Sequence, residues 1–440
     1  MAEKTENRPL AVPSGRVNRA ARLGGMTAGV AGNMAFGGIA QLARGQRPRM
    51  RDLLMTPRNI GRVAEELARM RGAAMKIGQL VSMDSGDILP PELAQIMARL
   101  RADAHFMPPA QLKQVLNVQW PKGWLGQFAR FDVRPIAAAS IGQVHRAQTK
   151  DGRDLAIKVQ YPGVAQSIDS DVANVGALIK VSGLLPKGFD LAPYLEEGRQ
   201  QLHEETDYAR EGRYLDRFGS LLAGDARFTL PVLQPDWTTP QILAMTYVSG
   251  DPIEAALDLP QADRNRIAHD LIDLLLWELF DVGLMQTDPN FANYRYDRDT
   301  GRIVLLDFGA TREIAPAIVG QYKALMRAGM AGDAQGLRDA ALAIGFVTGD
   351  VDPRHQAQIL AMMGMAFDVL RVGDAYDFSD TALSNQMQKE GLALAEDGFI
   401  PPPLPVDVLF LQRKFGGIFL LAARLRAQVD VKGLLTRYLA

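Results

Sequence analysis

The chain has 440 residues, a net charge of −1 and an apolar content of 47%. This length suffices for two or three packed units. The near-neutral charge and the apolar content exclude a disordered chain and give no sign of a nucleic-acid interface, so we expect no nucleic-acid partner. Because the sequence contains no cysteine, disulfides, iron–sulfur ligation and a thiol nucleophile are also excluded. The lack of cysteine fits a reducing compartment such as the cytoplasm.

Residues 23–43 form an uncharged run that contains six glycines and lies between arginine-rich segments. Its length would span a bilayer, but the glycines make it less apolar than an ordinary spanning helix. Gly25 and Gly29 have the spacing of small residues that let two helices approach closely. We interpret residues 1–50 as a leader that contacts a membrane peripherally or pairs with a second copy in a homodimer. A flexible glycine-rich leader is the alternative.

Residues 51–125 are expected to form a helical extension. Apolar residues at helical spacing predict helices over 59–75, 91–100 and 109–116. The motif Lys-Ile-Gly-Gln at 76–79 lies between the first two helices. A lysine within a helix is usually only solvated, so the motif alone assigns no function.

From residue 126 short apolar strands replace the helices, which indicates an N-terminal lobe over 126–248 with a helical insert. Asp151-Gly152 is typical of a hairpin turn. The strand that follows ends in Leu155-Ala156-Ile157-Lys158, which is similar to the third strand of protein kinases, whose lysine holds the α- and β-phosphates of ATP. A lysine at the edge of a sheet is the alternative interpretation.

A run of small residues occupies the place of the glycine-rich loop of a kinase. It consists of Ala137, Ala138, Ala139 and Ser140. Glycine permits positive φ and close approach of the backbone to phosphates, and alanine restricts both. We therefore expect an altered preference between ATP and ADP.

Two helices, 164–182 and 192–222, follow the lysine strand. The second carries Glu205, Asp207 and Glu211, and Glu211 is the expected partner of Lys158. A solvated acidic face is the alternative for these carboxylates. Strands are predicted over 230–237 and 241–248. Met245, Tyr247 and Val248 would then belong to the hinge, whose backbone meets adenine.

Residues 249–440 are predicted to form a helical C-terminal lobe that carries the catalytic loop. After an apolar helix over 264–282, Asp288 stands five positions before Asn293, and Asp307-Phe308-Gly309 follows a strand. Kinases carry their catalytic Asp, a metal-binding Asn and a metal-binding Asp at this spacing. The amide oxygen of Asn293 and the carboxylate of Asp307 suit Mg²⁺, while Asp288 can orient or deprotonate the attacking group. The alternative is a strand that simply ends in a turn.

These motifs together resemble the UbiB family of atypical kinases, closest to its branch that serves ubiquinone biosynthesis in mitochondria and alphaproteobacteria. The resemblance extends over residues 12–430. It implies an α+β fold, two-lobed and protein-kinase-like, with an N-terminal helical extension and a helix-rich C-terminal lobe. It also implies ATP and ADP binding, Mg²⁺ and ATPase activity.

The resemblance also implies residue roles. Lys76 and Gln79 would lie over the active site, with Lys76 paired to the acids Glu205 and Asp207. Lys158 would form an ion pair with Glu211, and Asp288 would be the catalytic acid. Asn293 and Asp307 would be the metal ligands. The chain departs from widespread bacterial members by Gln286 in place of a histidine and by Phe291-Ala292 in place of Pro-Gly. Many members end in transmembrane helices, whereas no segment after residue 300 here is long and apolar enough to span a membrane.

Three functions compete. The first is an ATPase that supports ubiquinone biosynthesis, acting on membrane lipids, quinone precursors or the biosynthetic enzymes while peripherally bound to the inner membrane. The second is a protein or small-molecule kinase, and the third is a nucleotide-sensing scaffold. After Gly309 the chain turns helical within about six or seven residues, which leaves no platform for a peptide. The complete set of catalytic residues argues against a scaffold, so the sequence favours the ATPase.

Overall fold

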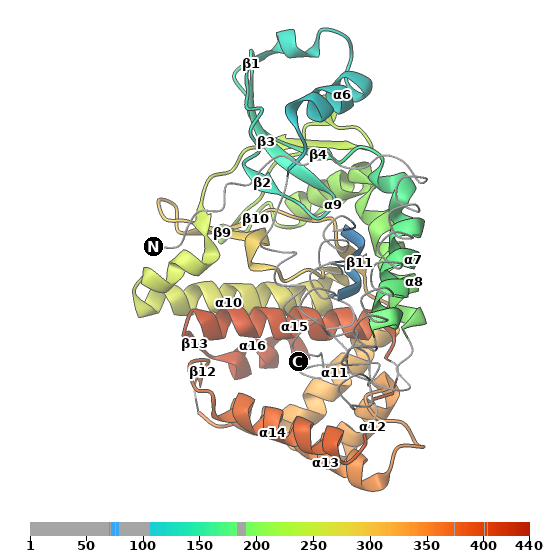
Figure 1. Cartoon of the computed structure of the whole chain (residues 1–440). Helices are drawn as coiled ribbons and strands as arrows, with labels where there is room; N and C mark the ends of the chain where they lie inside the picture. The colour runs from blue at the N-terminus through green and yellow to red at the C-terminus, as the bar shows by residue number, and fades with distance from the viewer. Residues whose placement is uncertain are drawn as a thin grey trace, which may run out of the picture. The chain divides into compact units, whose positions relative to one another are not determined.

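The computed structural model describes residues 70, 72–74, 76–78, 106–182, 191–373, 375–399, 401–402 and 404–440 (Figure 1). The described residues do not include the leader with residues 23–43, the helix expected over 91–100 or Gln79. Of the helix expected over 59–75, they include only residues 70 and 72–74. The chain divides into two compact units. Unit 1 runs to Asp216 and includes Val232–Tyr247, and unit 2 contains Arg217–Pro231 and Val248–Ala440. The last change of unit falls between Tyr247 and Val248, at the expected hinge.

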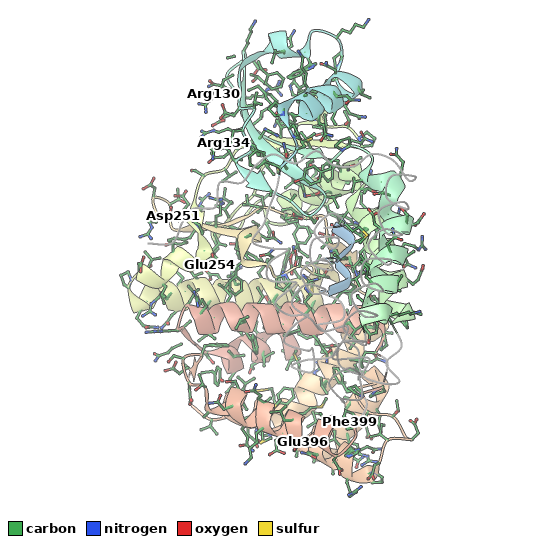
Figure 2. All side chains as sticks on the ribbon, in the orientation of Figure 1. Arg130, Arg134, Asp251, Glu254, Glu396 and Phe399 are labelled. Carbon is green, nitrogen blue, oxygen red and sulfur yellow. The ribbon has the colours of Figure 1, made fainter. Side chains whose placement is uncertain are left out.

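Unit 1 is built on an antiparallel sheet of five strands in the order β1-β3-β4-β6, with β2 also paired to β3. The strands are β1 Phe128–Phe131, β2 Ala137–Ala138, β3 Gly142–Thr149, β4 Asp154–Gln160 and β6 Ile242–Thr246. The turn between β3 and β4 contains Gly152 at φ 92°, so the expected hairpin is confirmed. Arg130 of β1, labelled in Figure 2, pairs with Asp132 at 2.5 Å.

An aromatic cluster packs against buried residues of this sheet. Helix α6 (Pro109–Gln119) leads into Trp120, whose ring stacks on Phe128 with centroids 5.5 Å apart. The indole N–H of Trp120 donates to the carbonyl of Trp237 at 3.0 Å. Trp124 meets Trp120 edge to face at 5.1 Å. Such pairs add to the stabilisation that comes from burying the ring surface.

Three further helices belong to unit 1: α7 Val164–Ser182, α8 Ala192–Glu205 and α9 Tyr208–Leu221. The end of α9, from Arg217, belongs to unit 2. Helices α7 and α8 lie side by side (Figure 1). The prediction of one helix over 192–222 is wrong. The chain breaks at Thr206, and the carboxylate of Asp207 caps the next helix by accepting from the N–H of Arg210 at 2.9 Å.

The prediction of a strand over 230–237 is also wrong. The segment makes an isolated bridge between Leu233 and Met245 and then a 3₁₀ turn, Pro235–Trp237. Pro231 and Pro235 lack the N–H that a continuous ladder requires.

Unit 2 contains three small sheets. A four-stranded sheet has the order β5-β10-β9-β7, and β8 pairs with β11 and β12 with β13. The strands are β5 Phe228–Thr229, β7 Asp251–Pro252, β8 Leu284–Gln286, β9 Tyr294–Asp297, β10 Arg302–Leu305, β11 Thr311–Glu313, β12 Tyr376–Asp377 and β13 Gln428–Val429. Asp251 of β7, labelled in Figure 2, accepts from Arg298 at 2.6 Å.

Helices supply most of unit 2. They are α10 Gln261–Trp277, α11 Pro316–Ala331, α12 Ala334–Ile344, α13 Pro353–Arg371, α14 Ala382–Glu396, α15 Val406–Arg424 and α16 Val431–Leu439. Helices α10 and α15 lie side by side (Figure 1), and a π-helical turn, Glu278–Val282, extends α10 towards β8. Tyr438 of α16 donates to buried Asp273 of α10 at 2.8 Å, which fixes the last helix. Within the described part of the chain, every helix is too short or too polar to cross a bilayer.

The aromatic cluster predicts a large stability effect. Trp120 is 4% exposed, so Trp120→Ala leaves a cavity and should cost about 3–5 kcal/mol of unfolding free energy. Urea denaturation followed by circular dichroism measures this loss. Val118 of the preceding helix is 74% exposed, and Val118→Ala should leave the transition unchanged. Equal transitions for the two variants would show that the cluster does not stabilise unit 1.

Candidate active site

Lys158 and Glu211 form a buried ion pair in unit 1. Strand β4 is paired on both sides, so Lys158 is a central residue of the sheet and not an edge residue. Its ammonium lies 2.8 and 2.9 Å from the two carboxylate oxygens of Glu211. The side chains are 10% and 5% exposed. Glu211 lies in the first turn of α9, where the helix dipole favours a negative charge. The expected ion pair is therefore present.

The alanine-rich turn is tight and partly paired. Ala137 and Ala138 form β2, and the N–H of Ala139 donates to the carbonyl of Gly142 at 2.8 Å. A Cβ on Gly142 would lie 2.4 Å from the carbonyl oxygen of Val159, so this position requires glycine. The turn thus closes through backbone contacts on Gly142, while Ala137 and Ala138 pair with β3 as strand β2 and Ala139 and Ser140 lie in the turn that follows.

Glu205 joins this turn to the helical segment that contains Lys76. Residues 72–74 and 76–78 are helical. One carboxylate oxygen of Glu205 forms an ion pair with Lys76, and the other accepts from the hydroxyl of Ser140 at 2.8 Å. A Cβ on Gly72 would lie 3.4 Å from the carbonyl oxygen of Ser140, so the helical segment packs closely on the turn.

The expectation that Lys76 pairs with both acids needs correction for Asp207. Glu205 ends α8, whereas Asp207 caps α9 through Arg210 and lies 3.6 Å from the guanidinium of Arg213. The helix break directs the two carboxylates to different partners. Glu205 is thus the acid that contacts Lys76.

The residues expected to form the hinge differ in their surroundings. Met245 is buried in β6 between Ala156 of β4 and the bridge to Leu233. Tyr247 follows the strand, donates from its N–H to the carbonyl of Asp154 at 2.8 Å and lies under the guanidinium of Arg146. Val248 is the first residue of unit 2 after the strand.

The loop from Asp288 to Asn293 in unit 2, which is predicted to be catalytic, is ordered by hydrogen bonds of its own asparagine side chains. Asn290 accepts from the N–H of Ala292 at 3.1 Å and starts a 3₁₀ turn, Phe291–Asn293. The side-chain NH₂ of Asn293 donates to the carbonyl and to Oδ2 of Asp288, at 3.2 and 3.3 Å. This orientation leaves Oδ1 of Asn293 as the atom that can bind a metal ion.

The Asp-Phe-Gly turn lies next to this loop. The N–H of Leu306 donates to the carbonyl of Asn293 at 3.0 Å, which places Asn293 beside the residue that precedes Asp307. Oδ1 of Asp307 accepts from the N–H of Gly309 at 2.9 Å. Phe308 is buried against Phe218 with ring centroids 4.9 Å apart.

The donor set of Asn293 and Asp307 fits a hard cation such as Mg²⁺. An amide oxygen and a carboxylate are ligands that Mg²⁺ prefers. Among the described residues, no three histidine, aspartate or glutamate side chains gather into a metal site. Magnesium commonly takes only one or two protein ligands and completes its shell with phosphate and water, so two ligands suffice here.

Sequence reasoning missed two cations of helix α15. Nη2 of Arg413 donates to Oδ1 of Asp288 at 2.5 Å. The ammonium of Lys414 donates to Gln286 at 3.1 Å and to the hydroxyl of Tyr294 at 3.0 Å, and it lies 3.5 Å from Glu278. Burial raises the pKa of Glu278 to about 7, while the charge of Lys414 acts in the opposite direction. The only signal for these two residues in the sequence is that Arg413 and Lys414 are adjacent in an amphipathic run.

The α+β fold, the lysine–glutamate pair, the Asp288–Asn293 loop and the Asp-Phe-Gly turn together define a kinase-like protein. The family model described as the ABC1 atypical kinase-like domain matches residues 99–341. The chain belongs to this family of atypical kinases.

Two curated relatives and one solved structure show how far the similarity extends. The mitochondrial atypical kinase COQ8 of Saccharomyces cerevisiae is 37% identical over 422 residues, which cover 95% of this chain and 83% of that protein. The mitochondrial atypical kinase COQ8B of Rattus norvegicus is 35% identical, with coverages of 96% and 80%. The structure of Rv3197 with erythromycin from Mycobacterium tuberculosis shares the fold, with a TM-score of 0.60, 23% identity and coverages of 84% and 92%.

The buried ion pair predicts strong coupling between its members. Glu211→Gln removes the charge beside a buried ammonium and should cost about 3–5 kcal/mol. Lys158→Met should have a similar effect, and the double variant should lose about 0.5–3 kcal/mol less than the sum of the two. Urea denaturation of the four proteins measures this coupling.

The solvent-exposed pair Arg199–Glu196 of α8 is the control for this cycle. Glutamine at either or both positions should give coupling within experimental error, because exposed ion pairs contribute little. Additive losses at Lys158 and Glu211 would contradict a direct energetic link between them.

Proposed function

We propose that the protein is an atypical kinase-like ATPase that binds Mg-ATP and supports ubiquinone biosynthesis. The observation that carries this proposal is the Asp288–Asn293–Asp307 arrangement, in which an acid, an amide oxygen and a second carboxylate are held by side-chain and backbone hydrogen bonds of the two turns. The Lys158–Glu211 pair supports it from unit 1. Membership of the atypical kinases agrees with this chemistry.

In the proposed reaction each residue has one role. Lys158 binds phosphate oxygens of ATP or ADP, Asp307 and Oδ1 of Asn293 hold Mg²⁺, and Asp288 orients the attacking water. Magnesium neutralises charge on the phosphates when it is bound. The water oxygen bonds to the terminal phosphorus as the bond to the bridging oxygen breaks, and the water proton passes to Asp288 or to solvent. Ala137, Ala138, Ala139 and Ser140, with the hinge residues Met245, Tyr247 and Val248, are proposed to contact the nucleotide.

Water is favoured over a peptide as acceptor by the segment after Asp307. Strand β11 (Thr311–Glu313) pairs back onto β8, and α11 begins at Pro316. The chain between Gly309 and Pro316 hydrogen-bonds to β8 and its flanking residues from Ala310 to Ile314, which supports the absence of a peptide platform in this described segment. Lys76 and Gln79 are proposed to close the site further, with Lys76 held by Glu205. A kinase acting on protein or on a small molecule is the second candidate, and a nucleotide-sensing scaffold is the third.

The proposed setting is the surface of the inner membrane. The relatives COQ8 and COQ8B are mitochondrial, and the UbiB resemblance connects the family with ubiquinone. Membrane lipids, quinone precursors and enzymes of quinone biosynthesis are the proposed partners. The uncharged run at 23–43, which lies outside the described residues, is the proposed lipid contact or homodimer contact.

The metal assignment predicts the behaviour of Asp307→Asn. This change keeps the shape of the side chain and removes the charge that binds magnesium, so Mg-dependent stabilisation by ATP and phosphate release should both disappear. Thermal-shift titration with ATP, with and without Mg²⁺, measures the first effect. The unliganded variant should melt near the wild-type temperature. A full Mg-ATP shift in the variant would refute the metal assignment.

The ATPase proposal predicts phosphate release without transfer to generic peptides. The intact protein is incubated with γ-labelled ATP and a peptide mixture, and free and peptide-bound label are counted. Lys76→Ala should lower the melting temperature, because Glu205 keeps its charge but loses its cation, and should raise self-phosphorylation relative to hydrolysis. Efficient peptide labelling by the unmodified protein would place the protein kinase first.

A further inference from the structure

One face of helix α15 contacts the catalytic loop over two successive helical turns. Arg413 donates to Asp288, Lys414 donates to Gln286, and Gly417 faces Pro289. All of these residues belong to unit 2. The helix contacts the loop before, at and after the catalytic acid.

Both carboxylate oxygens of Asp288 are held. Oδ1 accepts from Nη2 of Arg413 at 2.5 Å, and Oδ2 accepts from the amide of Asn293 at 3.3 Å. Two donors on opposite oxygens fix the rotation of the carboxylate. Each oxygen retains a second lone pair, so Asp288 can still accept a hydrogen bond from an attacking group.

The cation next to Asp288 comes from outside the loop. Positions 289–292 are Pro-Asn-Phe-Ala and carry no charge. The side chains of Arg413 and Asp288 are 14% and 23% exposed, so the pair is less screened by water than a surface ion pair. An arginine also binds a carboxylate with a rigid planar group that a lysine does not reproduce.

Gly417 sets the distance between helix and loop. A Cβ at this position would lie 2.3 Å from Cγ and 2.4 Å from Cβ of Pro289. The proline ring is rigid, so any larger residue forces the helix or the loop to move. At the neighbouring Gly416 a Cβ would meet no atom within 4 Å.

We infer that Arg413 is a positioning residue for phosphoryl transfer, and that α15 sets the orientation of the Asp288 carboxylate through Arg413 and the close contact at Gly417. This inference rests on the proposed function, in which Asp288 orients the attacking group. It adds a helix more than a hundred residues away in sequence to the catalytic machinery.

The first test compares Arg413→Gln with Arg413→Lys in the full chain. Loss of orientation should lower kcat for phosphate release about 10- to 100-fold, because small displacements of reacting groups have effects of this size. The KM for Mg-ATP should stay within about twofold, since Arg413 contacts the acid and not the nucleotide-binding residues. The lysine variant should recover part of kcat, because it restores the charge without the planar fork.

Arg298→Gln is the matched control for Arg413. Arg298 also pairs with an aspartate in unit 2, Asp251 at 2.6 Å, but on the sheet that contains β7. Its kcat should equal that of the wild type.

The second test removes no polar group. Gly417→Ala should lower kcat with little change in KM, because the added methyl separates α15 from Pro289. Gly416→Ala makes the same change on open surface and should leave kcat unchanged. The pair remains informative if Arg413→Gln fails to fold.

The outcomes separate this inference from the proposed function. Asp288→Asn with full turnover would refute the role of Asp288 and with it both proposals. Loss of turnover in Asp288→Asn with unchanged kcat in Arg413→Gln and Gly417→Ala would overturn the inference alone. A parallel loss of Mg-ATP affinity and kcat in Arg413→Gln, without recovery in the lysine variant, would also overturn it by indicating a purely structural role.

Discussion

One buried cation, Lys414, links several segments of unit 2 that surround Asp288. Removing an ammonium from water costs several kcal/mol unless oxygens replace the lost hydration. For Lys414 these oxygens come from Gln286, Tyr294 and Glu278. They belong to β8, β9 and the π-helical turn, so one side chain requires all three segments to be in place around α15. The loop that carries Asp288 runs between two of them, and its position follows from this constraint.

In unit 1, two further lysines link separate segments through ion pairs. Lys158 links the central strand β4 to α9 through Glu211, and Lys76 links the helical residues 72–74 and 76–78 to α8 and the alanine turn through Glu205. A half-broken pair leaves a charge without its counterion, which costs more than the pair contributes when intact. These contacts therefore specify one arrangement of strand, turn and helix more than they add net stability.

Sequence reasoning succeeded where the information was local or belonged to a motif. The loop from Asp288 to Asn293 could be predicted because five residues of spacing encode it, and α7 has the expected bounds. The break at Thr206 was missed because apolar periodicity continues through it, while a cap by Asp207 decides the outcome. Arg413 was missed because its partner lies 125 residues earlier, and an amphipathic helix does not specify which loop its polar side chains will meet.

The path of the chain after the Asp-Phe-Gly turn bears on whether water or a peptide is the phosphoryl acceptor. The N–H of Thr287 donates to the carbonyl of Ala310 at 3.0 Å, and Thr311 pairs with Gln286. The chain after Gly309 therefore pairs with the strand that precedes Asp288 and continues directly into α11. A kinase that binds a peptide needs an extended segment at this place. Here the residues after Gly309 instead pair with the strand that precedes Asp288, which agrees with the proposed transfer to water.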